Sequence, residues 1–305
     1  MFLRRCFFML FLILTISCSK DAATSLNEDV DTEVLDDGSN NVPDGVVINR
    51  VKDTLIYYDN TSNYTFSDYV ISGNKIISKT KTVFSVLFGL QSTPVITNYN
   101  YVYNNGNLIS SDGDLYNETH YDNMGRLEWA DADTLNYNRH YHYLYPADNV
   151  VHCEMLDASY GSASANVIMN IFMTFSSYGN LITIETDSAN FPKVNFVLRN
   201  GNVTKIKYFY TPPEVHEINY TTAIDTRNII NANTYGRKNY LLINAFRVAT
   251  GDFRYLLTRN YIDTNPGPQH VDFQVNEANF IKRLKSSFLV NGSTHIYSTL
   301  DYTLE

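Results

Sequence analysis

Beyond Val46 the chain is dominated by runs in which apolar or aromatic side chains alternate with polar ones. A period of two is the pattern of half-buried β-strands, whose successive side chains point to opposite faces. The runs are separated by short turns rich in Asn and Gly, and each return run opens with an aliphatic residue. Asn-Gly between such runs is a strong hairpin signal, because type I′ turns need positive φ at both central residues. We therefore predict an antiparallel meander of hairpins.

The unit of strand, turn and return strand recurs along the chain. Its clear copies are Tyr99 to Leu108, His120 to Leu127, Phe175 to Leu181 and Val194 to Val203, and its looser copies are Ile71 to Ile76 and Phe273 to Ile281. Hairpins in series predict a single all-β domain over residues 46–305, a curved, partly closed sheet or barrel-like body. A membrane-spanning barrel fits less well, because the aromatic residues lie mid-strand beside Asn and Thr instead of at the strand ends.

One stretch carries the spacing of a helix. Within Arg237 to Ala249, apolar residues recur three and four positions apart at Leu241, Leu242, Ala245 and Val248. For this stretch we keep a helix packed on the sheet as the alternative to a strand.

The first 17 residues have the pattern of an export signal. Arg4 and Arg5 precede an apolar run from Cys6 to Ile16. This run is too short to span a bilayer as a helix, which takes about 20 residues, so a signal that is removed fits better.

The residues that follow the apolar run indicate a lipid anchor. Thr15-Ile16-Ser17-Cys18 resembles the lipobox of bacterial lipoproteins, although the usual Leu stands at position 14, one place further from the cysteine. The resemblance implies removal of residues 1–17 and a diacylglycerol or palmitate anchor on Cys18. Ser19-Lys20-Asp21 resembles the tag of surface-exposed lipoproteins of Bacteroidota, which implies outward display. An ordinary signal peptide or an uncleaved anchor is the alternative.

Residues 18–45 are predicted to be an acidic flexible linker, because their composition buries too little surface to offset the entropy of ordering. Without the signal the chain keeps 21 basic against 32 acidic residues, a net charge of −11. That balance argues against a nucleic-acid partner, which requires a basic surface to displace phosphate counterions.

The hairpin unit also resembles a known repeat. His120 to Leu127 is similar to the tyrosine/aspartate (YD) repeats of envelope and toxin-shell proteins, whose copies read roughly Tyr-x-Tyr-Asp-x-x-Gly-Arg-Leu. With its lipoprotein-like start, the chain from residue 46 to 305 resembles a Bacteroidota lipoprotein family of unknown function that is described as having a porin-like fold. The resemblance implies a curved β-sheet and no assigned activity.

Tyrosine is the most prominent candidate for binding chemistry, with 24 residues in the chain against one Trp. Two alternating groups each place three phenol rings on one face of a predicted strand: Tyr99, Tyr101 and Tyr103 in the first, and Tyr141, Tyr143 and Tyr145 in the second. Exposed rings would form a platform on which a glycan stacks. Covered rings would instead form a ladder of cross-strand pairs in the core. The two interpretations predict opposite burial.

Two histidines are candidates for metal binding. His140 and His142 project from one face of a predicted strand, but a metal would need a further ligand, such as His120 or His152 from neighbouring strands. A polar strand face is the alternative, and the sequence indicates no metal and no cofactor.

The candidates for catalysis are equally few. Asp131 and Asp133 share a face if their segment is extended, and glycoside hydrolysis requires paired carboxylates, although acidic residues after a turn are common. Asp112-Gly113-Asp114 is interpreted as a turn, and Cys153 as a buried reduced thiol without a disulfide partner. No catalytic motif with a fixed spacing is present, so we expect no enzyme.

These patterns predict a protein held in the outer membrane by its lipid anchor and facing the cell surface. Three short matches to the Asp-Ser/Thr-aliphatic pattern of Bacteroidota O-glycosylation sites support export: Asp53-Thr54-Leu55, Asp133-Thr134-Leu135 and Asp187-Ser188-Ala189. The first hypothesis for function is a non-catalytic binding or envelope structural module, with a glycan as the possible ligand. The alternatives are a glycan-active enzyme and an accessory subunit of an outer-membrane transporter, whose partner would be another outer-membrane protein. An exposed apolar edge or patch would favour the last.

Overall fold

Two large antiparallel sheets make up the structure, a computed structural model that describes residues 34–39, 45–56, 64–87, 90–112, 114, 116–134, 137–157, 161, 165–263, 269–290 and 293–305. The predicted signal peptide, Cys18 and most of the predicted linker lie outside these residues. Over the described part the prediction of an all-β, mainly antiparallel fold is confirmed. No helix in that part is long and apolar enough to cross a membrane.

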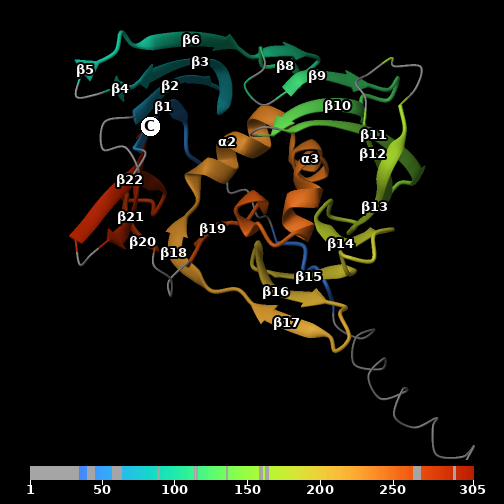
Figure 1. Cartoon of the computed structure of the whole chain (residues 1–305). Helices are drawn as coiled ribbons and strands as arrows, with labels where there is room; N and C mark the ends of the chain where they lie inside the picture. The colour runs from blue at the N-terminus through green and yellow to red at the C-terminus, as the bar shows by residue number, and fades with distance from the viewer. Residues whose placement is uncertain are drawn as a thin grey trace, which may run out of the picture. The chain divides into compact units, whose positions relative to one another are not determined.

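The larger sheet is a meander in which each strand pairs with the next strand in the chain (Figure 1). In spatial order its nine strands are β17 (Glu214–Glu217), β16 (Asn202–Tyr208), β15 (Val194–Arg199), β14 (Leu181–Thr186), β13 (Val167–Phe175), β12 (Val150–Leu156), β11 (Tyr137–Ala147), β10 (Leu127–Thr134) and β9 (Tyr116–Tyr121).

The seven-stranded sheet joins both ends of the domain, because β22 pairs with β1. Its spatial order is β20 (Gln269–Val275), β21 (Ile281–Val290), β22 (Ser293–Leu304), β1 (Ile48–Ile56), β2 (Tyr64–Ser72), β3 (Lys75–Phe84) and β6 (Val95–Asn100). Over the residues that the structure describes, neither large sheet closes on itself, since each has two edge strands.

Three short strand pairs complete the β structure. They are β4 (Val86–Leu87) with β5 (Leu90–Gln91), β7 (Val102–Asn104) with β8 (Asn107–Ser110), and β18 (Tyr220–Ile224) with β19 (Asn260–Ile262). In sequence order, the β7–β8 hairpin lies between β6, an edge strand of the seven-stranded sheet, and β9, an edge strand of the nine-stranded sheet. The hydroxyls of Thr119 and Tyr121 on β9 donate hydrogen bonds to the carbonyl of Leu108 on β8, at 2.7 and 2.8 Å.

All of the predicted hairpins are present. Three have two-residue turns with positive φ at both central residues, as the Asn-Gly signal requires: Gly73-Asn74, Asn105-Gly106 and Asn200-Gly201. They connect β2 to β3, β7 to β8 and β15 to β16. Local turn chemistry therefore fixes these connections.

The other three hairpins share a longer turn with a common construction. A short polar side chain opens the turn and accepts hydrogen bonds from the backbone two and four residues later. Asp122 accepts from Met124 and Arg126, each at 2.9 Å. The same bonds are made by Ser176 to residues 178 and 180, and by Asn276 to residues 278 and 280. This bonding explains why Asp, Ser and Asn replace one another in the repeated unit.

Two helices cover the inner faces of the sheets (Figure 1). The predicted alternative of a helix from Arg237 to Ala249 is confirmed as α3 (Arg237–Ala249), which packs on β10, β13 and β14. The other helix, α2 (Thr226–Tyr235), contacts β3 and β8 and was not predicted. Gly236 joins the two helices with a φ of 76°, a conformation that glycine adopts without strain. A 3₁₀ turn, η1 (Phe253–Tyr255), follows α3.

Two acidic residues of the predicted linker contact the hairpin turns of the nine-stranded sheet. Asp36 forms a parallel bridge with Leu198 of β15, and its carboxylate accepts hydrogen bonds from Ser176 at 2.5 Å and Asn180 at 2.8 Å. Asp37 accepts a bond from the backbone of Asn200 at 2.8 Å. Acidic side chains are good acceptors for the free hydrogen-bond donors of hairpin turns. Asp36 and Asp37 therefore bind to these turns, although the composition around them is typical of a linker. Asp36 and Asp37 thus belong to the compact unit, which runs from Asp36 to Glu305.

Candidate functional site

The second tyrosine group does not form an exposed platform. Tyr141 and Tyr143 on β11 are only 4% and 1% exposed, and they belong to the core. Tyr145 is half-buried, and its hydroxyl donates a 2.6 Å hydrogen bond to the carbonyl of Leu127. The rings share one face of the strand, as predicted. That face packs into the core, so its burial corresponds to the ladder interpretation.

The first tyrosine group is divided between elements. Tyr99 lies at the end of β6, Tyr101 lies in the link to β7, and Tyr103 lies on β7. Tyr101 is 5% exposed and donates a 2.5 Å hydrogen bond to Asp114, while the half-buried Tyr103 donates one of 2.6 Å to the carbonyl of Ile76. These rings are covered too. Their burial also corresponds to the ladder interpretation, and glycan binding stays a prediction.

The candidate histidines pair separately on the outer face of the nine-stranded sheet. His140 Nδ1 lies 2.8 Å from the carboxylate of Asp131, directly across from it on β10. His142 Nδ1 lies 2.8 Å from Glu154 on β12. Among the described residues, no group of three or more His, Cys, Asp or Glu is placed to hold a metal. The two histidines thus lie on a polar strand face, each next to a different carboxylate.

The candidate carboxylate pair is not brought together as a site. Asp131 is buried and accepts a 2.8 Å hydrogen bond from the indole Nε1 of Trp129, in addition to its contact with His140. The side chain of Asp133 lies outside the described residues. Cys153 is buried and free, and burial raises the pKa of its thiol, which makes it unreactive.

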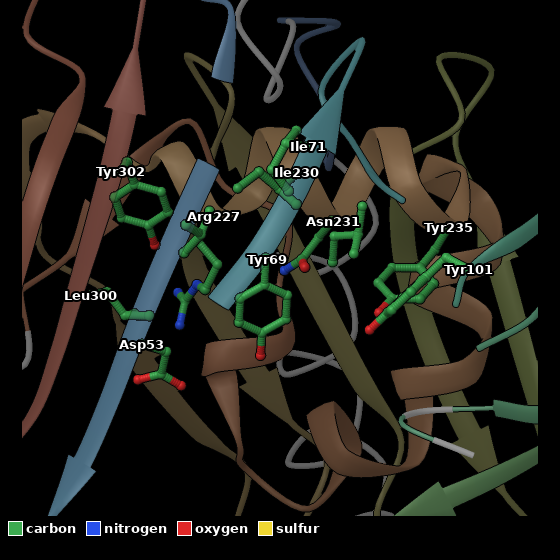
Figure 2. Close-up of a pocket in the computed structure, with 12 residues that line it drawn as sticks. Asp53, Tyr69, Ile71, Tyr101, Arg227, Ile230, Asn231, Tyr235, Leu300 and Tyr302 are labelled. Carbon is green, nitrogen blue, oxygen red and sulfur yellow. The ribbon is translucent and has the colours of Figure 1, made fainter. Parts of the chain in front are cut away.

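A cavity of about 260 Å³ lies between the inner face of the seven-stranded sheet and α2 (Figure 2). Its walls are mostly aliphatic and aromatic, and the charged and amide groups among them are one carboxylate, one guanidinium and one amide. The lining residues are Val51, Asp53, Tyr69, Ile71, Ile76, Tyr101, Arg227, Ile230, Asn231, Tyr235, Leu300 and Tyr302. An apolar hollow with a few polar groups is the usual make-up of a small-molecule site.

Strand register explains why distant residues meet in this wall. On β1, Val51 stands opposite Tyr302 of β22 on one side and Tyr69 of β2 on the other. Asp53, two residues further on, shares that inner face and stands opposite Leu300. One face of three paired strands thus supplies most of the sheet side of the cavity. Tyr101 is the one predicted site residue that lines it.

An ion pair stands beside the cavity next to Tyr101. The ammonium of Lys79 lies 2.6 Å from Asp114, whose other oxygen accepts the hydroxyl of Tyr101. The same ammonium lies over the rings of Tyr69 and Tyr99, at 5.1 and 5.5 Å from their centroids. Lys79 and Asp114 therefore neutralise each other in a largely buried setting. The sequence had indicated only a turn at Asp114.

The guanidinium of Arg227 enters the cavity from the first turn of α2. Asp225 caps this helix by accepting from the backbone of Arg227 at 3.0 Å, and it also pairs with the guanidinium at 2.9 Å. Burial opposes the charge of Arg227, but the combined attraction of Asp225, Tyr240, Tyr302 and Tyr261 exceeds it, so the pKa of the guanidinium lies above its ordinary value. The Nε of Arg227 is buried and has no hydrogen-bond partner within the described part of the chain.

Asp53 is the exception among the charged groups. Its half-buried carboxylate joins no ion pair and accepts no side-chain hydrogen bond from any described residue. Burial raises the pKa of this carboxyl above its ordinary value, and the attraction of Lys79 only partly opposes the rise. In the view of Figure 2, Asp53 and Arg227 lie on one side of Tyr69, and Tyr101 and Tyr235 lie on the other. The charged groups thus lie toward one side of the cavity together with Tyr302, and Tyr101 and Tyr235 lie toward the other.

Comparison with known proteins gives no assignment of this cavity. No protein-family model matches the sequence, and no curated protein matches it. Among solved structures the chain is similar to a porin-like protein from Bacteroides uniformis ATCC 8492, with 10% sequence identity, a TM-score of 0.40, and coverage of 85% of this chain and 98% of that one. A TM-score of 0.40 is too low for this similarity to support a conclusion about function. The resemblance to YD repeats and to a lipoprotein family stays a prediction.

Replacing Asp53 by Asn should stabilise the protein at neutral pH. The pKa of the Asp53 carboxyl in the folded protein lies above the ordinary 3.8. The free energy of unfolding therefore falls as pH rises from 3.8 through the raised pKa. The variant lacks this loss, so its Tm at pH 7 should exceed that of the parent by about 2 °C, and the gain should vanish below the ordinary pKa. Calorimetry against pH measures this difference. The control is Glu128→Gln, the same change of charge on an exposed residue of β10, and a variant less stable than the parent at pH 7 would contradict the account.

Proposed function

We propose that this protein is a lipid-anchored protein of the outer membrane, displayed at the cell surface, whose domain binds a small molecule without transforming it. The anchor is supported by the short apolar run, the lipobox-like Thr15-Ile16-Ser17-Cys18 and the Ser19-Lys20-Asp21 that follows. Binding is supported by the cavity between the seven-stranded sheet and α2. Its apolar walls suit a ligand with an apolar body, and its few polar groups would orient that ligand.

The arrangement of acids supports binding over hydrolysis. Glycoside hydrolysis requires two carboxyl groups that face each other across the scissile bond. Among the residues that line the cavity, Asp53 is the one carboxylate. The neighbouring acids Asp114 and Asp225 are held in ion pairs with Lys79 and Arg227. A glycan-active enzyme is therefore the weaker alternative.

A second candidate function is a subunit that docks on an outer-membrane transporter. One observation favours it, a row of exposed apolar side chains on the outer face of the nine-stranded sheet. Leu144 of β11 and Phe172 of β13 lie in one cross-strand row on either side of His152, whose ring stacks on Phe172 at 4.6 Å. Exposed apolar surface of this kind is typical of protein contacts.

Lipid attachment at Cys18 predicts a simple labelling result. Cells expressing the full chain are fed an alkynyl palmitate, and the captured protein is probed for the label. The parent should carry the label and Cys18→Ala should lose all of it, because the modified thiol is gone. Cys153→Ala, the matched control at the buried cysteine, should keep it. Label retained in Cys18→Ala would remove the anchor from the proposal.

Binding in the cavity predicts a thermal shift that a filled cavity abolishes. The purified full chain is screened against small molecules with apolar bodies, alongside mono- and oligosaccharides. A ligand at one hundred times its Kd should raise Tm by about 5 °C or more. Ile230→Phe, which places a larger ring in the cavity wall, should suppress the shift, whereas Ile77→Phe on an exposed position of β3 should preserve it.

Two results would contradict the proposed binding. One is a screen in which no compound shifts Tm. The other is a shift of equal size in the parent and in Ile230→Phe, since the ligand would then bind elsewhere.

A further inference from the structure

We propose that the ligand of this cavity is an organic ammonium ion with an apolar body and a hydrogen-bond acceptor. The inference rests on the proposed binding function and names the ligand class. It follows from three features of the described residues. These are the unpaired carboxylate of Asp53, the aromatic wall of the cavity, and the Nε–H donor of Arg227, which has no acceptor.

The charges in and beside the cavity balance except at Asp53. Lys79 pairs with Asp114 at 2.6 Å, and Arg227 pairs with Asp225 at 2.9 Å. Asp53 has no such partner among the described residues, although it lines the cavity and is half-buried. An unpaired carboxylate away from water is costly, and a bound cation removes that cost. Burial raises the pKa of Asp53, and the attraction of Lys79 only partly opposes the rise, so a further cation at this carboxylate would favour its ionised form.

The aromatic wall suits an ammonium ion. Four tyrosine rings line the cavity, those of Tyr69, Tyr101, Tyr235 and Tyr302. The face of an aromatic ring attracts a cation within about 6 Å of its centroid. The protein already holds one ammonium in this way, since Lys79 lies 5.1 Å from the ring centroid of Tyr69 at the edge of the same wall. Rings that face apolar side chains also accept the apolar body of the ligand.

Arg227 adds a requirement for an acceptor. Its charge is already balanced by Asp225, but its buried Nε–H donates to no described residue. A buried donor without an acceptor costs free energy, and an oxygen on the ligand would restore the bond. In the view of Figure 2 the guanidinium and the Asp53 carboxylate lie on the same side of Tyr69. The ligand should therefore carry an acceptor for Nε of Arg227 as well as an ammonium group for Asp53.

Other ligand classes fit less well. A purely anionic ligand would meet the unpaired carboxylate of Asp53 with like charge. A sugar would bring many hydroxyls against the aliphatic side chains of Val51, Ile71 and Ile230 and leave them without hydrogen bonds. A plain ammonium compound satisfies Asp53 but leaves the Nε of Arg227 unbonded.

Four phenyl compounds separate these requirements when titrated into the purified full chain in detergent by calorimetry, with detergent alone as the blank. Phenylalanine amide carries the ammonium and a carbonyl acceptor, and 2-phenylethylamine carries the ammonium alone. 3-Phenylpropanamide is neutral, and 3-phenylpropionate is an anion. Phenylalanine amide should bind at least about tenfold tighter than the neutral amide, the magnitude of one charge-assisted hydrogen bond, and the anion should bind most weakly.

Variants then assign the effect to the two side chains. Asp53→Asn should weaken phenylalanine amide about tenfold and leave the neutral amide within twofold. Arg227→Lys keeps a cation for Asp225 and removes Nε, so it should weaken phenylalanine amide but not 2-phenylethylamine. Glu128→Gln, the control, should change neither. The Tm of each variant shows that it is folded.

The outcomes distinguish the inference of an ammonium ligand from the more general proposal that the cavity binds a small molecule. Equal affinities for phenylalanine amide and the neutral amide, unchanged in Asp53→Asn, would overturn the ammonium inference and leave a small-molecule site in place. If the four compounds do not bind, the ammonium inference falls. If the broad screen against the parent is also negative, the proposed function falls with it.

Discussion

The structure depends on burying the inner faces of two open sheets, and the two helices between them do so in different ways. Helix α3 packs apolar side chains, among them Leu241, Leu242 and Val248, on the nine-stranded sheet. Helix α2 buries Ile229, Ile230 and Tyr235 in the core, and hydrogen bonds also hold both of its ends. The hydroxyl of Thr226 donates to the carbonyl of Ile281 at 2.6 Å, and Thr234 accepts from the backbone of Ile76 at 3.1 Å.

The hydrogen bonds at the ends of α2 position this helix beside the cavity. Hydrogen bonds have a narrow range of length, so the two threonines fix the position of α2 over the seven-stranded sheet. Between them, Ile230 and Asn231 face the sheet without filling the space above Val51 and Tyr69. The cavity thus lies between the two ends at which polar contacts hold the helix on the sheet. The charges of Asp53 and Arg227 then give the cavity its chemical character.

The fold could be predicted from the sequence wherever local chemistry decides it. Asn105-Gly106 and Asn200-Gly201 specify their turns by backbone conformation alone, and Leu241 to Val248 specify α3 by apolar spacing. Helix α2 could not be predicted in this way, because its buried side chains include Thr226, Asn228 and Thr234, which interrupt any apolar stripe. The docking of Asp36 was missed for a similar reason, since an acidic residue in a polar stretch gives no sign of its partners.

The site was less predictable because it is assembled across long sequence separations. The alternating tyrosines were correctly predicted to share strand faces on β11, but which face is covered depends on the helices. In the sequence, Asp53 belongs only to Asp53-Thr54-Leu55, a short match to a glycosylation pattern. Its isolation becomes visible only when β22, β2 and α2 are placed around it, and when the neighbouring acids are seen to have partners of their own.

The most direct test of this account is to measure the pKa of the Asp53 carboxyl by carbon-detected NMR, with the resonance assigned by its absence in Asp53→Asn. In the free protein the pKa should lie above 3.8, and it should fall when an ammonium compound saturates the cavity, because a cation favours the ionised form. A pKa at or below 3.8 in the free protein would show that the carboxylate is already compensated. That result would contradict the central claim that Asp53 is the unbalanced charge of the cavity.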